Sequence, residues 1–138
     1  AYSAIQSAIQ YPNTYKCAVA NAGIYDLELM FESGDIPKRM QGKSFLKRVL
    51  GTDKTALRAM SPVNHVDKIQ IPILLAHGED DYRAPVEHVE NLRDALDKSK
   101  KDYEWYVVDG EGHGFYNPKT QRAYMKNVVD FLSYHLEM

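Results

Sequence analysis

The chain has 138 residues, of which 44% are hydrophobic and 26% are charged, enough for one globular domain with a buried core. Its formal net charge of −2 gives no reason to expect a nucleic-acid or an anionic-membrane partner. No apolar run approaches the roughly 20 residues of a membrane-spanning helix, and no signal peptide is visible. The single cysteine excludes an intrachain disulfide and slightly favours the cytoplasm, although the sequence otherwise leaves the localisation open.

The pattern of apolar residues predicts helices and strands in alternation along the chain. A first helix over residues 1–11 is followed by a short strand over 16–23 that ends in a glycine turn. Residues 25–58 mix short helical stretches with glycines and a proline, which predicts an irregular helical excursion. Residues 71–76 are continuously apolar, which is typical of a parallel strand covered on both faces.

The C-terminal half of the chain continues this alternation. A helix should begin at Pro85 and reach about residue 96, and the β-branched and aromatic residues 103–108 predict a strand. The last helix covers about 120–136, with its apolar side chains along one face. The order helix, strand, excursion, strand, helix, strand, helix predicts an α/β fold with a parallel sheet flanked by helices.

In such a fold, functional side chains gather in the loops that follow the carboxyl ends of the strands. The loop after the second strand carries three acids: Glu79, Asp80 and Asp81. The loop after the third strand carries His113 between two glycines. An acid and then a histidine after successive strands is the pattern of two members of a catalytic triad, in which the acid orients the imidazole. We expect Gly112 and Gly114 to let the backbone turn the His113 ring into a cleft.

Each of these residues also has a simpler interpretation. A loop histidine is commonly just exposed to solvent, and three adjacent acids are typical of a solvated turn. A metal site built from His77, Asp80, Asp81 and His113 is conceivable, but their spacing lacks the tight pairs of metal-binding motifs. The sequence therefore predicts no metal and no cofactor. The four histidines other than His113 are expected to be structural or exposed.

The segments "HGEDDYRAP" after the second strand and "GHGF" after the third are motifs in a row. Together they resemble the C-terminal end of the α/β-hydrolase domain of the prolyl oligopeptidase family. Members have a strand, the pattern His-Gly-x-x-Asp-x-x-Val-Pro, and later Gly-His-Gly-Phe before a closing helix. The sequence matches with "HGEDDYRAP" and "GHGF", with Ala84 in place of the valine. The similarity covers essentially the whole chain and is weakest over residues 28–55. The resemblance implies that Asp81 is the acid and His113 the general base of a serine hydrolase triad.

The same resemblance extends to substrate binding. Family members often place a polar side chain two residues after the triad aspartate, which would set Arg83 on a backbone carbonyl of the substrate; a solvated arginine is the alternative. The loop after the first strand resembles the family's Ala-Pro-Val-x-Asp-Trp segment, which lines the pocket for the residue before the scissile bond. Ile24 and Leu27 belong to this segment. Gly23 replaces its proline and Leu27 its tryptophan, so the size of the pocket stays open.

A triad also needs a nucleophile, which α/β-hydrolases carry on a Gly-x-Ser-x-Gly turn between a strand and a helix. No serine of the chain has a glycine both two residues before it and two residues after it. The resemblance aligns "AYSAIQ" with the residues after this turn, which would place the serine three residues before Ala1. We therefore expect residues 1–138 to be the C-terminal fragment of one peptidase domain, without turnover of its own.

The leading hypothesis is a serine peptidase that cleaves a peptide substrate by acyl transfer. A carboxylesterase or another acyl hydrolase of the same fold stays open, as does a non-catalytic module that keeps the motifs as scaffold. The sequence does not determine the preferred substrate residue, exo- or endopeptidase action, or an upstream propeller domain. A sheet edge left exposed would favour self-association, so a homo-oligomer is a further expectation.

Overall fold

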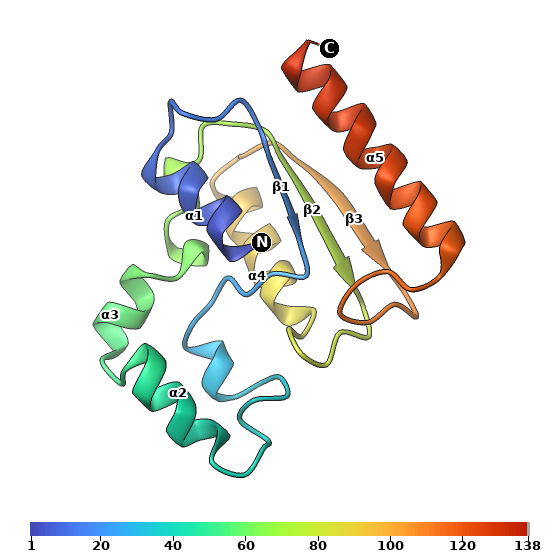
Figure 1. Ribbon diagram of the computed structural model, residues 1–138. Coiled ribbons are helices and arrows are strands. Elements are labelled where there is room, and N and C mark those ends of the chain that lie inside the picture. The colour runs from blue at the N-terminus through green and yellow to red at the C-terminus, as the bar shows by residue number, and fades with distance from the viewer. Residues whose placement is uncertain (138) are drawn as a thin grey trace.

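The computed structural model describes residues 1–137, which form a parallel sheet with helices on both faces (Figure 1). Its strands lie in chain order: β1 (Ala18–Asn21), β2 (Ile73–Gly78) and β3 (Tyr103–Val108). Ala18 is paired with Ile73, and Ile73 with Tyr103, so the strands start at the same level of the sheet. The expected α/β class with a parallel sheet is confirmed.

The helices surround this sheet. They are α1 (Tyr2–Gln10), α2 (Gly42–Leu50), α3 (Lys54–Ala59), α4 (Glu87–Lys98) and α5 (Pro118–Leu136), with short 3-10 turns at Leu29–Phe31, Pro62–Asn64 and Val66–Lys68. The helical excursion expected over 25–58 is confirmed, since it holds the first 3-10 turn together with α2 and α3. Among residues 1–137, no helix is both long and apolar enough to cross a membrane.

Two helix starts differ from expectation for local reasons. α4 begins at Glu87 and not at Pro85, because the carbonyl of Pro85 accepts the His88 N–H at 2.9 Å in a tighter preceding turn. α5 begins at Pro118, where the missing N–H of proline has no cost. Its N-cap is Asn117, whose side chain accepts the Lys119 N–H at 2.9 Å.

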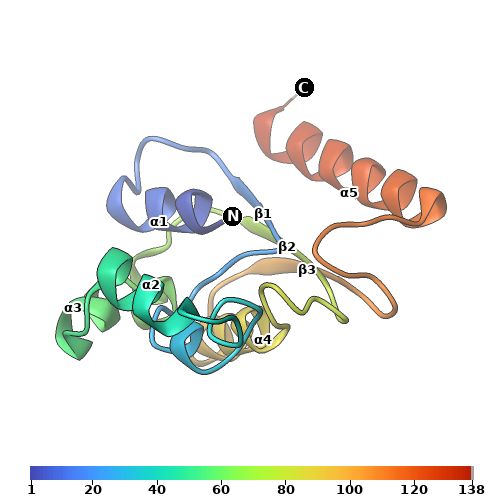
Figure 2. The same ribbon diagram turned by 60° about the horizontal axis from the view of Figure 1, so that its bottom comes forward.

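The main core lies between the sheet and the helices α1 and α4. It joins side chains from α1, β1, β2 and α4: Ile5, Ile9, Ala20, Ile73, Leu75, Val89, Leu92 and Leu96. Leu74 and Ala76 alternate with the core residues of β2 and are buried as well, so this strand is covered on both faces, as expected. Figure 2 shows α5 on the side of the sheet opposite α4. Its Tyr124 packs there against Tyr106 of β3 and Phe115.

His88 ties α4 to the loop that follows β1. Its Nδ1 accepts the backbone N–H groups of Tyr25 and Asp26, each at 3.4 Å, so the ring proton is on Nε2. The ring is fully buried, and this burial lowers the pKa of His88 to about 4. Protonation would turn Nδ1 into a donor that faces two other donors. The folded chain therefore holds His88 neutral.

The buried His88 predicts a loss of stability in acid. The unfolded chain takes up a proton at His88 near pH 6.5, whereas the folded chain does so only near pH 4. The contribution of the neutral His88 to the free energy of unfolding is therefore complete above pH 6.5. About 3 kcal/mol of the free energy of unfolding should be lost as the pH falls from 6.5 through 4. The free energy of unfolding, measured in urea at several pH values from about 7 to 4.5, should fall less with decreasing pH for His88→Gln than for the wild type. His135→Gln on α5 is the control. The same dependence of the free energy of unfolding on pH in the wild type and in His88→Gln would contradict the prediction.

Candidate active site

β2 and β3 end side by side, because Gly78 is paired with Val108 at the carboxyl end of the sheet. Two backbone hydrogen bonds continue this pairing into the loops. The Glu79 N–H donates to the Val108 carbonyl, and the Asp80 N–H donates to the Glu111 carbonyl, both at 2.9 Å. The loop with the acids and the loop with His113 therefore leave the sheet as neighbours.

Asp81 and His113 are joined by a hydrogen bond of 2.8 Å between Oδ2 and Nδ1. A carboxylate oxygen accepts, so Nδ1 carries the proton and Nε2 of the neutral ring has a free lone pair. The Asp81 side chain is fully buried, whereas the His113 side chain is 35% exposed and lines a cavity. The acid is thus shielded from water while the ring can present its basic nitrogen to a ligand.

The Asp81 carboxylate is held by its own loop. Oδ1 accepts the backbone N–H groups of Arg83 and Ala84, each at 2.9 Å. An aspartate that folds back onto the next residues in this way fixes the backbone conformation of residues 81–84. With Oδ1 occupied by the backbone, Oδ2 is left to face His113.

His77 is a second imidazole beside the same acid. It is the residue before the last in the buried strand β2, is 0% exposed, and donates from Nε2 to the Ala84 carbonyl at 2.6 Å. The same Nε2 lies 3.4 Å from Oδ2 of Asp81. Burial lowers the pKa of His77, so the ring donates as a neutral group and adds no charge next to Asp81. The sequence led us to expect His77 only to be structural or exposed, and the structure gives it this structural contact.

Glu111 closes the loop that carries His113, and the sequence had not marked it as functional. Its Oε2 accepts the Tyr116 N–H at 2.8 Å, and its Oε1 accepts the Asn117 N–H at 3.2 Å. The hydrogen bond from Tyr116 is the main reason why the pKa of Glu111 lies below its usual value. The carboxylate thereby draws residues 111–117 into a closed loop with His113 near its tip.

Of the two glycines that flank His113, only Gly114 needs the conformational freedom of glycine, at φ +123°. Its N–H donates to the Gly112 carbonyl at 2.8 Å, which closes a three-residue turn centred on His113. Gly112 has no positive φ, and a Cβ added there would meet nothing closer than 3.9 Å. The expectation that both glycines are needed is therefore wrong for Gly112.

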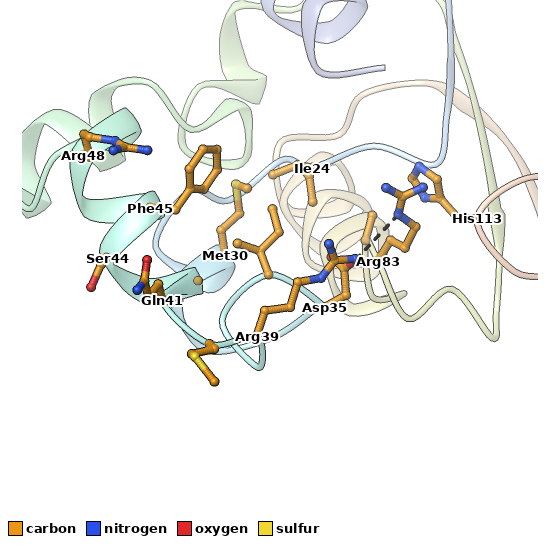
Figure 3. A pocket seen from close by; sticks show the side chains of 14 residues that line it. Ile24, Met30, Asp35, Arg39, Gln41, Ser44, Phe45, Arg48, Arg83 and His113 are labelled. Carbon is orange, nitrogen blue, oxygen red and sulfur yellow. Dashed lines mark hydrogen bonds and ion pairs between the residues drawn. The ribbon is translucent and has the colours of Figure 1, made fainter.

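A cavity of about 730 Å³ lies beside His113 (Figure 3). Ile24 and Arg83 line it, as the sequence led us to expect. Leu27 is not among the lining residues, because it is buried in the core with its backbone N–H bonded to Ser61 Oγ at 2.9 Å. The structure thus brings Ile24 and Arg83 to the side of His113 and leaves Leu27 out.

The residues of the metal hypothesis do not form a ligand set. Among residues 1–137, no group of three His, Cys, Asp or Glu side chains is arranged to hold a metal ion. The Asp80 side chain is exposed, and Nε2 of His77 is already bonded to the Ala84 carbonyl. What the site offers is an imidazole base oriented by a buried carboxylate.

A model of the prolyl oligopeptidase family matches residues 1–138, the whole chain. The chain belongs to this family. A similar protein from Bacillus subtilis (strain 168), named "Uncharacterized peptidase YtmA", is 28% identical over 130 residues. These residues are 91% of this chain and 48% of that protein, so the chain spans about half the length of this curated relative.

Solved structures of peptidases share the fold. The puromycin-hydrolyzing peptidase of Mycobacterium tuberculosis superposes with a TM-score of 0.84 at 25% identity, over 96% of this chain and 20% of that one. The acylaminoacyl peptidase of Pyrococcus horikoshii gives a TM-score of 0.88 at 22% identity, over 99% of this chain and 22% of that one. The chain therefore has the α/β-hydrolase fold of the peptidases in the prolyl oligopeptidase family.

Proposed function

We propose that the chain is part of the catalytic domain of a serine peptidase, with Asp81 as the orienting acid and His113 as the general base. The 2.8 Å hydrogen bond between Asp81 Oδ2 and His113 Nδ1 is the observation that carries this proposal. Membership of a peptidase family and the position of His113 at the cavity support it.

In the proposed reaction, Nε2 of His113 takes the proton of a serine hydroxyl while the serine oxygen attacks the carbonyl carbon of the peptide bond. The same nitrogen then gives this proton to the leaving amine, and an acyl-enzyme remains. Water next attacks the acyl carbon through the same base, which releases the acid product and the serine. Asp81 stays ionised throughout and stabilises the imidazolium that forms in each half of the reaction.

The serine itself would be supplied from outside residues 1–138. The sequence holds no Gly-x-Ser-x-Gly turn, and the chain covers only 48% of the curated relative. Within the chain, the proposed substrate contacts are Arg83, for a backbone carbonyl of the peptide, and Ile24, as part of the wall of its pocket. Both line the cavity beside His113, and the Arg83 side chain is 55% exposed and free to meet a ligand.

Hydrolysis assays on two lengths of the protein test this function. A longer protein that contains this chain should hydrolyse peptidyl or aminoacyl anilides, whereas the 138 residues alone should release no product above the uncatalysed rate. The 138-residue chain with His113→Ala is the blank for contaminating hydrolases. Cleavage of matched esters without anilides would favour a carboxylesterase, and inactivity on both would favour a non-catalytic module. Turnover by the wild-type chain alone, absent from the blank, would contradict the proposal.

A further inference from the structure

The cavity beside His113 carries more positive charge than the proposed reaction uses. Three arginines line it against a single carboxylate: Arg39, Arg48, Arg83 and Asp35. The whole chain, by contrast, has a net charge of −2. A cavity with an excess of positive charge attracts ligands of negative charge.

Asp35 neutralises only one wall of this cavity. It forms an ion pair with Arg39 four residues along the chain, and its Oδ2 lies 3.8 Å from Nε of Arg83. One carboxylate is therefore shared between two guanidinium groups, and Figure 3 shows the three side chains together at the end of the cavity near His113. Most donors of Arg83 stay free, which is compatible with its proposed contact to the peptide backbone.

Arg48 of α2 lies at the other end of the cavity in Figure 3. Its guanidinium carbon is 5.9 Å from the centre of the Phe45 ring, and no ion pair to an acid is found for it within residues 1–137. Apolar side chains of Ile24, Met30 and Phe45 lie between the two ends. A ligand that runs from His113 along this wall passes the charged cluster of Arg83, Asp35 and Arg39, then the apolar surface, and reaches the unpaired Arg48 at the far end.

We propose that this cavity is a binding site for an acidic peptide, with a carboxylate of the peptide on Arg48 and its aliphatic part against Ile24, Met30 and Phe45. The guanidinium fork suits a carboxylate, and the aromatic ring below it keeps the group in place. This names the substrate class of the proposed peptidase and therefore rests on that function. The carboxylate can come from a glutamate side chain or from a free C-terminus, which differ in the residue that the site selects.

Equilibrium binding to the 138-residue chain tests the site without any need for a nucleophile. Two pairs of N-acetylated tetrapeptides serve as probes. In the first pair both peptides have an amidated C-terminus, and one contains Glu where the other contains Gln. In the second pair the sequence is the same, and one peptide has a free C-terminal carboxylate where the other is amidated. Titrations followed by the backbone amide signals of Ile24, Ser44 and Phe45 should show one anionic peptide binding about tenfold tighter than its neutral partner. This difference in affinity should become smaller when the salt concentration is raised from about 0.05 to 0.5 M. The pair that shows it identifies the source of the carboxylate.

Matched arginine variants complete the test. Arg48→Gln should remove the preference, so that the anionic and the neutral peptide of the pair bind with equal affinity. Arg93→Gln is the control, because Arg93 lies over the Trp105 ring of β3 at 4.6 Å and does not line the cavity. Equal affinities in both pairs, absence of binding by all four peptides, a preference that survives Arg48→Gln, or its loss in Arg93→Gln would each overturn the proposal. An intact preference in a longer protein that hydrolyses nothing would count against the proposed function alone.

Discussion

Replacement of His113 by alanine, in a longer protein that contains this chain, should lower kcat for peptide hydrolysis by about 10³-fold or more. Without the ring, nothing at the site takes the proton of the attacking serine or returns a proton to the leaving amine. KM should change little, because the walls of the cavity that bind the peptide are left in place. Steady-state rates on one anilide substrate give both parameters.

Asp81→Asn isolates the contribution of the acid and should lower kcat by about 10⁴-fold. The amide oxygen can still accept the backbone N–H groups of Arg83 and Ala84, so the turn is kept. Its NH₂ group would then face Nδ1 of His113, which becomes an acceptor, and the proton moves to Nε2, where the base is needed. His135→Ala on α5 is the control and should keep the wild-type kcat. A kcat within about threefold of wild type for either site variant would refute the assigned role.

Gly78→Ala should lower the free energy of unfolding by about 3 kcal/mol, through a forced shift of backbone against backbone. A Cβ at Gly78 would lie 2.1 Å from the Gly112 carbonyl oxygen and 2.3 Å from that of Glu111. Both obstacles are main-chain atoms, so no side-chain rotation can relieve the overlap. The loop that carries His113 has to move away from the end of β2, and we expect its hydrogen bond to Asp81 to weaken as well.

Gly112→Ala provides the matched control on the other side of the same contact. Its added Cβ would lie 3.9 Å from the Tyr116 ring and 4.0 Å from the Asp80 carbonyl oxygen, which is ordinary van der Waals contact. The free energy of unfolding should therefore change by less than about 1 kcal/mol. Urea unfolding of the two variants and the wild type gives the comparison. Equal losses for Gly78→Ala and Gly112→Ala would show that close approach is not what requires glycine at residue 78.

Most of the fold followed from local patterns in the sequence. Continuous apolarity over residues 71–76 predicted a strand buried on both faces, and β2 is one. Breakers at Gly34, Pro37, Gly42 and Gly51 predicted interrupted helices between β1 and β2. Gly42 differs from this expectation, because it is the first residue of α2. The ends of elements were less well predicted, because they depend on individual hydrogen bonds such as the one from His88 to Pro85 before α4.

The candidate site was predicted as far as motifs reach. Loop position and the family resemblance singled out Asp81 and His113, but only the folded chain brings Oδ2 within 2.8 Å of Nδ1. Glu111 and Arg48 carried no signal, because their roles depend on which backbone or cavity they meet after folding. The family resemblance predicted that Leu27 lines the pocket, but Leu27 is buried in the core, where its backbone N–H donates to Ser61 Oγ.

The role of Asp81 and His113 as activators of a serine is tested most directly by labelling a longer protein with a serine-reactive fluorophosphonate. Mass spectrometry of the digested protein then locates the label, and a time course gives its rate. We predict one labelled serine, outside residues 1–138, with a rate at least about 100-fold lower in His113→Ala and in Asp81→Asn. A label within residues 1–138, or undiminished labelling of both variants, would contradict the assignment.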